Sequence, residues 1–140
     1  MSSVSSVMTA NPATCSEDTA VRDVARMMAD CDCGEIPVVD AKGKLVGVVT
    51  DRDITLRIVA QGRDTTATAR DAMSAPVRSV HEDSGVEECA RLMKDAQVRR
   101  IPVIDEAGRP VGIVALADII QQTHPETATE VVREVSRPAG

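Results

Sequence analysis

The chain contains no phenylalanine, tyrosine or tryptophan among its 140 residues. This absence excludes the aromatic stacking platforms with which proteins bind single-stranded nucleic acid. A planar ligand would have to lie between aliphatic side chains and backbone. The formal net charge of −6 also argues against nucleic acid and anionic membranes as partners, because both are bound through clustered lysine and arginine. An anionic small molecule would need a local basic patch.

Long hydrophobic runs are missing as well. No apolar stretch approaches the ~20 residues that cross a membrane, and the first six residues have neither the basic start nor the apolar run of a signal peptide. The hydrophobic share of 43% is typical of a soluble globular protein. We therefore expect a cytoplasmic location.

What the sequence does contain is a repeat of its own pattern at a spacing of 65 residues, without a gap. The coinciding pairs include Met8 with Met73, Met28 with Met93, Gly47 with Gly112 and Asp53 with Asp118. A fixed-period repeat predicts copies of one structural unit that share a core, and two copies favour a closed pair over a solenoid. We expect repeat 1 at residues 1–60, a linker at 61–71, repeat 2 at 72–122, and a C-terminal tail at 123–140 that could form a short helix.

Each repeat predicts the order strand, helix, strand, strand, helix, which is an α/β fold. After a short extended piece (13–15 and 78–80), apolar residues at helical spacing predict a first helix. Thr19 and Ser84 are its N-cap candidates, and Ser84 to Glu87 has the spacing of a capping box.

The remaining elements follow in the same order in both repeats. Residues 36–40 and 101–105 are rich in β-branched residues, with a proline that favours a sheet edge or a strand start. Residues 45–50 predict a strand covered on both faces, and a second helix follows through Val59. In repeat 2 this second helix runs from Leu116 to Gln122.

The four cysteines do not follow the spacing of a zinc ribbon or of a CxxC redox motif. Three of them stand opposite valines in the other repeat: Cys15 opposite Val80, Cys33 opposite Val98 and Cys89 opposite Val24. Because free cysteine packs as a small hydrophobic residue, we interpret these three as core-filling residues rather than as a metal or redox site.

Two motifs in register carry a family resemblance. They are Ile36 to Asp40 followed by Gly47 to Asp53, and Arg100 to Asp105 followed by Gly112 to Asp118. From about Val7 to Gln121 the chain resembles a tandem pair of CBS (cystathionine β-synthase-type) repeats, most closely the small stand-alone bacterial proteins of the hypoxic-response type. The resemblance implies a pseudo-twofold CBS pair that senses AMP, ADP, ATP, NAD or S-adenosylmethionine between its repeats, without a catalytic cofactor, and that forms a disc-like homodimer.

The resemblance places a first nucleotide site around Asp53, whose carboxylate could accept hydrogen bonds from both hydroxyls of a ribose. Guanidinium groups suit phosphate because they donate two parallel hydrogen bonds. The residues expected at this site are Thr50, Arg52, Asp53, Ser79, Val80, Val98, Arg99, Arg100, Ile101 and Pro102. The residue types alone also allow simpler roles: Asp53 and Asp118 could only cap helices, and Arg99 with Arg100 could be a solvated pair.

The second site should differ from the first. Its expected residues are Thr14, Cys15, Cys33, Gly34, Ile36, Pro37 and Asp118. Ala115 takes the place of the hydroxyl residue Thr50, and Glu35 takes the place of a cation. A carboxylate near a phosphate is repulsive, by about 4 kcal/mol at ~4 Å and an effective dielectric near ~20. We expect this site to be empty or to hold a ligand with little negative charge.

Other function classes have less support. The sequence has no phosphate-cradling glycine-rich loop, no Ser-His-Asp set and no credible metal cluster, so we do not expect an enzyme. A ligand-free dimerisation scaffold stays open as an alternative, because fold does not determine function. In either case an unidentified effector protein would be the target, since the chain has no effector domain of its own.

Overall fold

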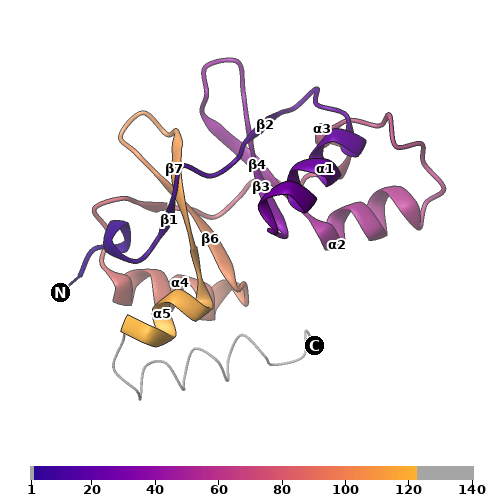
Figure 1. Cartoon of the computed structure of the whole chain (residues 1–140). Helices are drawn as coiled ribbons and strands as arrows, with labels where there is room; N and C mark the ends of the chain where they lie inside the picture. Colours follow the sequence, from indigo (N-terminus) through magenta and orange to yellow (C-terminus); the bar gives the residue numbers. More distant parts are fainter. Residues whose placement is uncertain (1, 123–140) are drawn as a thin grey trace. The chain divides into compact units, whose positions relative to one another are not determined.

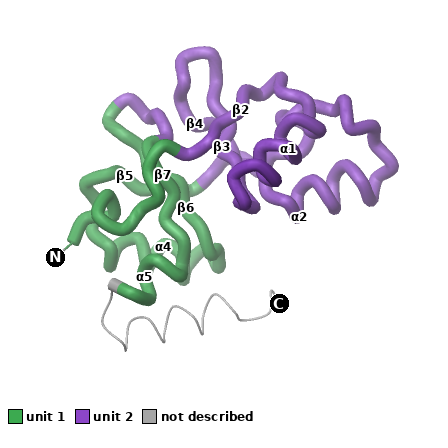
Figure 2. Tube along the Cα trace, viewed as in Figure 1, with its two compact units in different colours: residues 1–11, 78–106, 111–140 green, residues 12–77, 107–110 purple. Residues whose placement is uncertain are grey.

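The computed structural model describes residues 2–122, and the expected tail at 123–140 lies outside them (Figure 1). The chain divides into two compact units, each with its own hydrophobic core (Figure 2). Unit 1 comprises Met1–Asn11, Arg78–Glu106 and Val111–Gly140, and unit 2 comprises Pro12–Val77 and Ala107–Pro110.

Unit 2 contains a three-stranded sheet in the order β2 (Cys15–Ser16), β3 (Glu35–Val39) and β4 (Leu45–Thr50). Its helices are α1 (Val21–Cys31), α2 (Asp51–Asp53), which continues into the π-helical η2 (Ile54–Val59), and the short α3 (Ala69–Ala72). The apolar side of α1 and the side chain of Ile58 close over the sheet residues Ile36, Val38 and Val49, all of them buried.

Unit 1 contains a four-stranded sheet in the order β1 (Thr9–Ala10), β7 (Pro110–Ala115), β6 (Arg100–Ile104) and β5 (Val80–His81). Its helices are the short 3-10 helix η1 (Val4–Ser6), α4 (Val86–Ala96) and α5 (Leu116–Gln122). Val4, Met93, Ile101 and Ile119 are fully buried in its core.

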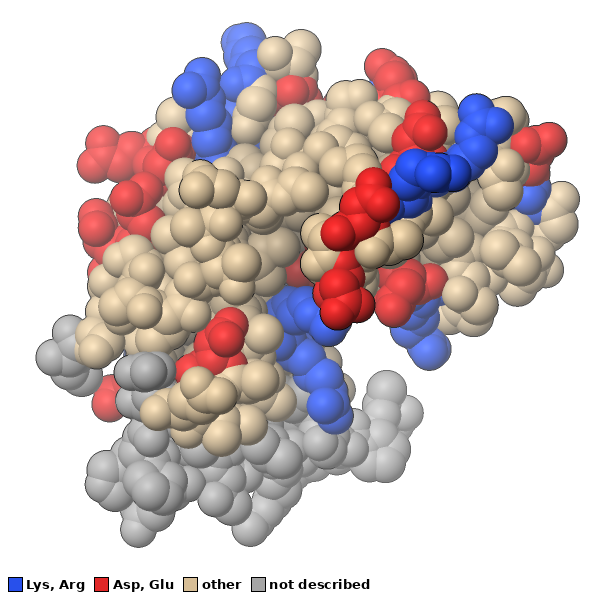
Figure 3. Space-filling view, in the orientation of Figure 1, with Lys and Arg blue, Asp and Glu red and all other residues tan. Residues whose placement is uncertain are grey.

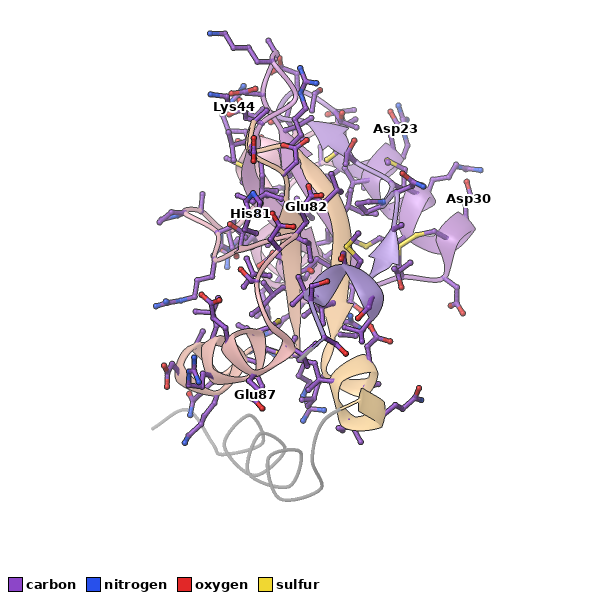
Figure 4. All side chains as sticks on the ribbon, turned by 90° about the vertical axis from the view of Figure 1, so that its left-hand side faces the viewer. Asp23, Asp30, Lys44, His81, Glu82 and Glu87 are labelled. Carbon is purple, nitrogen blue, oxygen red and sulfur yellow. A yellow bond between two sulfur atoms is a disulfide. The ribbon has the colours of Figure 1, made fainter. Side chains whose placement is uncertain are left out.

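The predicted order of elements is confirmed in both repeats: β2, α1, β3, β4, α2 and then β5, α4, β6, β7, α5. Both first helices are amphipathic. Asp23 and Asp30 on α1 and Glu87 on α4 point away from the sheets (Figure 4), while the apolar positions at helical spacing are buried. The apolar positions that the helical spacing predicted are therefore the positions that face the core in α1 and α4.

In the 65-residue register, residues 2–11 and 67–76 are equivalent, and we call them the opening segments of repeats 1 and 2. These two segments are exchanged between the repeats. In unit 2 the backbone N–H of Val21 donates to the carbonyl of Ala67 at 2.7 Å, and in unit 1 the N–H of Val86 donates to the carbonyl of Ser2 at 3.1 Å. Ser2 and Ala67 are equivalent positions of the repeat. Each first helix thus begins against the opening segment of the other repeat.

This exchange corrects the predicted helix caps. The N-caps are Ala20 and Gly85, one residue beyond Thr19 and Ser84, and neither makes a side-chain capping bond. The first N–H groups of these helices are satisfied by backbone carbonyls of a distant segment, so no side-chain cap is required. The hydroxyl of Thr19 instead accepts a hydrogen bond from the N–H of Ser16 at 3.0 Å.

We expected the two prolines to mark a sheet edge or a strand start. This expectation is wrong, because both prolines lie within strands that have a neighbour on each side. β3, which carries Pro37, lies between β2 and β4, and β6, which carries Pro102, lies between β7 and β5. The neighbouring strand β2 pairs only from Val38 onward and β5 only from Val103 onward. Among the described residues, no strand pairs with the proline on the side of β2 or β5, where a missing N–H costs no ladder bond.

The cysteines behave in two ways. Cys15 and Cys89 are free and buried, which confirms them as core-filling residues. Cys33 also packs against the core of unit 2, but the prediction of a free core-filling thiol is wrong there, because Cys33 forms a disulfide with Cys31. Asp32, between the two cysteines, has a left-handed conformation (φ 52°), and the two Cα atoms lie 5.4 Å apart.

Candidate functional site

The junction between β4 and α2 brings Thr50 and Asp53 together. The Asp53 carboxylate accepts a hydrogen bond from the N–H of Thr50 at 3.0 Å, and the Thr50 hydroxyl accepts one from the N–H of Asp53 at 3.0 Å. This is a capping box, in which two backbone N–H groups at the start of a helix are satisfied reciprocally. The capping role considered for Asp53 is therefore present in the structure.

Two further residues hold the same carboxylate. The hydroxyl of Ser74 donates to Asp53 at 3.2 Å from Oδ1 and 3.4 Å from Oδ2. The guanidinium of Arg57 donates to the carbonyl of Met73 at 2.6 Å and places its Nε 3.9 Å from Oδ1 of Asp53. Sequence reasoning missed both residues. The one available signal was that Met73-Ser74 recurs as Met8-Thr9 in the repeat register.

Gly47 explains how Ser74 comes so close. Ser74 forms a backbone bridge with Val48 on β4, with N···O distances of 2.9 and 3.2 Å. A Cβ atom on Gly47 would meet the sulfur of Met73 and the carbonyl oxygen of Ser74, each at 2.9 Å. Only glycine leaves room for this approach, so Gly47 keeps Ser74 within reach of Asp53.

The Asp53 carboxylate still has acceptor capacity. Its side chain is only 12% exposed, so it lies in a largely desolvated environment. A carboxylate offers about four acceptor positions, and the N–H of Thr50 and the hydroxyl of Ser74 do not use them all. The group can therefore accept hydrogen bonds from a ligand while it caps α2.

The equivalent junction in unit 1 is simpler. The N–H of Ala115 donates to the carboxylate of Asp118 at 2.9 Å, as Thr50 does to Asp53. Ala115 has no hydroxyl, so the reciprocal side-chain bond of the capping box is missing. The two repeats therefore differ at this junction by one hydrogen bond, the one that the Thr50 hydroxyl accepts from the N–H of Asp53.

The other residues expected at the first site fall into two groups. Arg52 is exposed on α2 in unit 2. The rest lie in unit 1, where Arg99 and Arg100 are exposed at the start of β6, and where Val80, Ile101 and Pro102 are buried and can offer a ligand only their backbone. Acidic and basic side chains are both scattered over the face seen in Figure 3.

The residues expected at the second site also belong to both units. Thr14, Cys15, Cys33, Gly34, Ile36 and Pro37 lie in unit 2, and Asp118 lies in unit 1. The side chains of Cys15 and Ile36 belong to the core of unit 2. Glu35 is buried, with 7% of its surface exposed, whereas its equivalent Arg100 is exposed.

Neither a metal site nor a membrane-spanning helix is found within residues 2–122. No group of three or more His, Cys, Asp or Glu side chains is arranged to hold a metal ion within this range. None of the helices there has the length and apolar character needed to cross a membrane.

Two α/β repeats with exchanged opening segments, and with an aspartate at each final strand-to-helix junction, define a duplicated module. Comparison with known families agrees: the CBS domain model matches residues 4–60 and 69–124. The chain belongs to the CBS domain family.

Two of the similar proteins have nearly the same length as this chain. CBS domain-containing protein YhcV of Bacillus subtilis is 39% identical over 137 residues, which is 97% of this chain and 96% of that protein. Hypoxic response protein 1 of Mycobacterium tuberculosis is 32% identical over 139 residues, which is 99% of this chain and 96% of that protein. The resemblance to the hypoxic-response type is thereby confirmed.

Solved structures of similar proteins include ligand complexes. The CBS domain pair of protein MJ0100, in complex with 5′-methylthioadenosine and S-adenosyl-L-methionine, is 30% identical with a TM-score of 0.78 over 86% of this chain and 94% of that one. CBSX2 in complex with AMP is 25% identical, with a TM-score of 0.73 over 86% of this chain and 95% of that one. CBS-pair relatives thus bind adenosine-containing molecules.

Proposed function

We propose that this protein is a regulatory module that binds an adenosine-containing ligand through Asp53. The support is the family membership together with the relatives that bind AMP, 5′-methylthioadenosine or S-adenosylmethionine. The observation that carries the proposal is the state of the Asp53 carboxylate, which is largely buried, rigidly held and only partly used as an acceptor.

The chemistry of a ribose fits this carboxylate. The two adjacent hydroxyls of a ribose are donors, and a carboxylate is an acceptor-only group with two oxygens. Each hydrogen bond to a charged group contributes about 1.5–3 kcal/mol. Because Asp53 is positioned by Thr50 and Ser74 before any ligand binds, little conformational freedom is lost on binding.

In this proposal the ligand also uses residues of unit 1. Arg99 and Arg100, with Arg52 from unit 2, bind phosphate groups. Ser79, Val80, Val98, Ile101 and Pro102 contribute mainly backbone contacts. A ligand that uses both units favours one relative arrangement of them, by no more than the difference in its affinity for the two arrangements.

We further propose that only the Asp53 site binds a phosphorylated nucleoside. Asp118 has no hydroxyl partner at position 115, and the position equivalent to Arg100 holds the buried acidic residue Glu35. A second, weaker site would take an adenosine derivative without phosphate, such as 5′-methylthioadenosine.

Isothermal titration with AMP, ATP and S-adenosylmethionine tests these statements. We expect one site for AMP or ATP, and a loss of about tenfold to a few hundredfold in affinity for Asp53→Asn. Asp118→Asn is the matched control, because it changes the equivalent junction, and it should leave the affinity for AMP or ATP unchanged. Two equal sites would refute the proposed asymmetry, and no binding of any of the three ligands would refute the sensor.

A second candidate function is a dimerisation scaffold, alone or combined with ligand binding. Leu56 and Val59 on η2 are 45% and 65% exposed, and Ile120 on α5 is 43% exposed. Leu56 and Val59 are three residues apart on one helix, and neighbouring exposed apolar side chains can form part of an interaction surface. Light scattering should then find a homodimer that Val59→Asp converts to a monomer, whereas Asp30→Asn, on the exposed side of α1, should leave the dimer intact.

A further inference from the structure

The disulfide between Cys31 and Cys33 is accessible to solvent. Cys31 is the last residue of α1 and is exposed, and Cys33 is half-buried. The Cα atoms lie 5.4 Å apart, within the usual range of about 4.4–6.8 Å for a disulfide. Cys31 is the more exposed of the two cysteines, so it is the one that a small thiol would approach.

The turn that joins the two cysteines is held by backbone bonds. The N–H of Asp32 and the N–H of Cys33 both donate to the carbonyl of Met28, the latter at 3.1 Å. Asp32 has the left-handed conformation, with φ 52°. These features are those of a common helix C-terminus.

The second repeat contains the same turn without cysteines. Gln97, equivalent to Asp32, has φ 55°, and the N–H of Val98 donates to the carbonyl of Met93 at 3.1 Å. The residues that match the cysteines are Ala96 and Val98. The turn therefore forms without a crosslink, and in unit 2 it holds the two thiols close together whether or not they are bonded.

We propose that Cys31 and Cys33 form a reversible thiol–disulfide exchange site whose reaction partners are low-molecular-weight thiols and disulfides. In the reducing direction, a small thiolate attacks Sγ of Cys31, the Cys31–Cys33 bond breaks, and Cys33 leaves as a thiolate that takes up a proton. A second small thiolate attacks the small-molecule sulfur of this mixed disulfide, the bond to Cys31 breaks, and Cys31 leaves as a thiolate that takes up a proton. The products are the protein dithiol and one small-molecule disulfide, and oxidation is the reverse.

The other two cysteines provide an internal contrast. Cys15 and Cys89 are buried, at 5% and 0% exposure. Burial raises the pKa of Cys15 to about 11 and that of Cys89 to about 12. Because the thiolate is the reactive form, exchange should be confined to the exposed pair.

Thiol counting on the full chain tests the proposal. After treatment with oxidised glutathione, we expect no reactive thiol in the folded protein and two after denaturation. After treatment with reduced glutathione followed by its removal, we expect two in the folded protein and four after denaturation, with cooperative thermal unfolding in both states. Four thiols in the denatured, oxidised protein would overturn the proposal, as would reduction that occurs only after unfolding.

Two variants sharpen the experiment. Cys33→Ser should leave Cys31 able to form a stable mixed disulfide with one glutathione, which mass spectrometry detects on the peptide that contains Cys31. Ala96→Cys/Val98→Cys places the same pair on the equivalent turn of repeat 2, and it should gain a second exchangeable disulfide. Failure of this new pair to close in the folded protein would overturn the claim that the turn itself holds the thiols together.

Discussion

The hydroxyl of Ser74 donates a hydrogen bond to the carboxylate of Asp53, which lies 21 residues earlier in the chain. Ser74 belongs to the opening segment of repeat 2, and Asp53 belongs to the last helix of repeat 1. The exchange of opening segments is therefore what completes the surroundings of the carboxylate. It also makes capping and ligand binding compatible, because Thr50 and Ser74 hold the group in place without using all of its acceptor positions.

Removal of the Ser74 hydroxyl should weaken ligand binding. In Ser74→Ala the Asp53 carboxylate loses one donor and part of its orientation. We expect the affinity for AMP, or for whichever tested adenosine ligand binds wild type, to fall about threefold to tenfold, since one hydrogen bond contributes about 1 kcal/mol. Isothermal titration provides the measurement.

Ser74→Thr is the matched control, because it retains the hydroxyl and should bind within about twofold of wild type, a difference well below 1 kcal/mol. If Ser74→Ala and Ser74→Thr bind equally well, the hydroxyl does not contribute to the site.

An added methyl group at Gly47 should destabilise unit 2. In Gly47→Ala the new Cβ would lie 2.9 Å from both the Met73 sulfur and the Ser74 carbonyl oxygen, so the bridge between Ser74 and Val48 must shift. We expect a loss of about 1–3 kcal/mol in the free energy of unfolding, as is typical of overpacking. Urea titration measures it.

Gly85→Ala serves as the control for this substitution, because a Cβ on Gly85 meets nothing within 4 Å. Equal urea midpoints for the two variants would show that the close approach at Gly47 is not tight.

Truncation of Val4 tests the place of the opening segment in unit 1. Val4 is fully buried in that core although it is among the first residues of the chain. Val4→Ala should lower the free energy of unfolding by about 2 kcal/mol, because it removes buried methyl groups and leaves a cavity. Arg26→Ala, at an exposed position of α1, should change it by less than about 0.5 kcal/mol. Similar values for the two variants would argue against a packed opening segment.

The buried thiols should make the protein sensitive to alkaline pH. Burial raises the pKa of Cys15 from 9.0 to about 11, so the unfolded chain loses this proton at lower pH than the folded chain. Stability is complete below about pH 9 and falls as the pH rises from 9 to about 11, by up to ~1.4 kcal/mol per pH unit for each such thiol.

Cys15→Val/Cys89→Val should lose less stability over this interval, and the equivalent positions Val80 and Val24 indicate that valine fits. Urea titrations at about pH 8 and about pH 10.5 compare the two, in a Cys31→Ser/Cys33→Ser background that prevents disulfide exchange. An identical fall with and without Cys15 and Cys89 would contradict the assignment.

The sequence by itself determined the repeat, the order of elements and the buried faces of the helices. These follow from local patterns: apolar residues at helical spacing predicted α1 and α4, and the run that ends in Asp53 predicted a strand followed by a helix. It also singled out Asp53 and Asp118 as equivalent positions. Such features depend on neighbouring residues, whose spacing along the chain is already their spacing in the structure.

Only the tertiary structure decided which segments meet. The caps of α1 and α4 come from Ala67 and Ser2, and the partner of Asp53 comes from Ser74, because the opening segments of the repeats are exchanged. The Cys31–Cys33 disulfide, which spans the left-handed residue Asp32, was likewise not predicted from the sequence. A contact between distant residues depends on how the whole chain closes around its core, and no local pattern in the sequence records that closure.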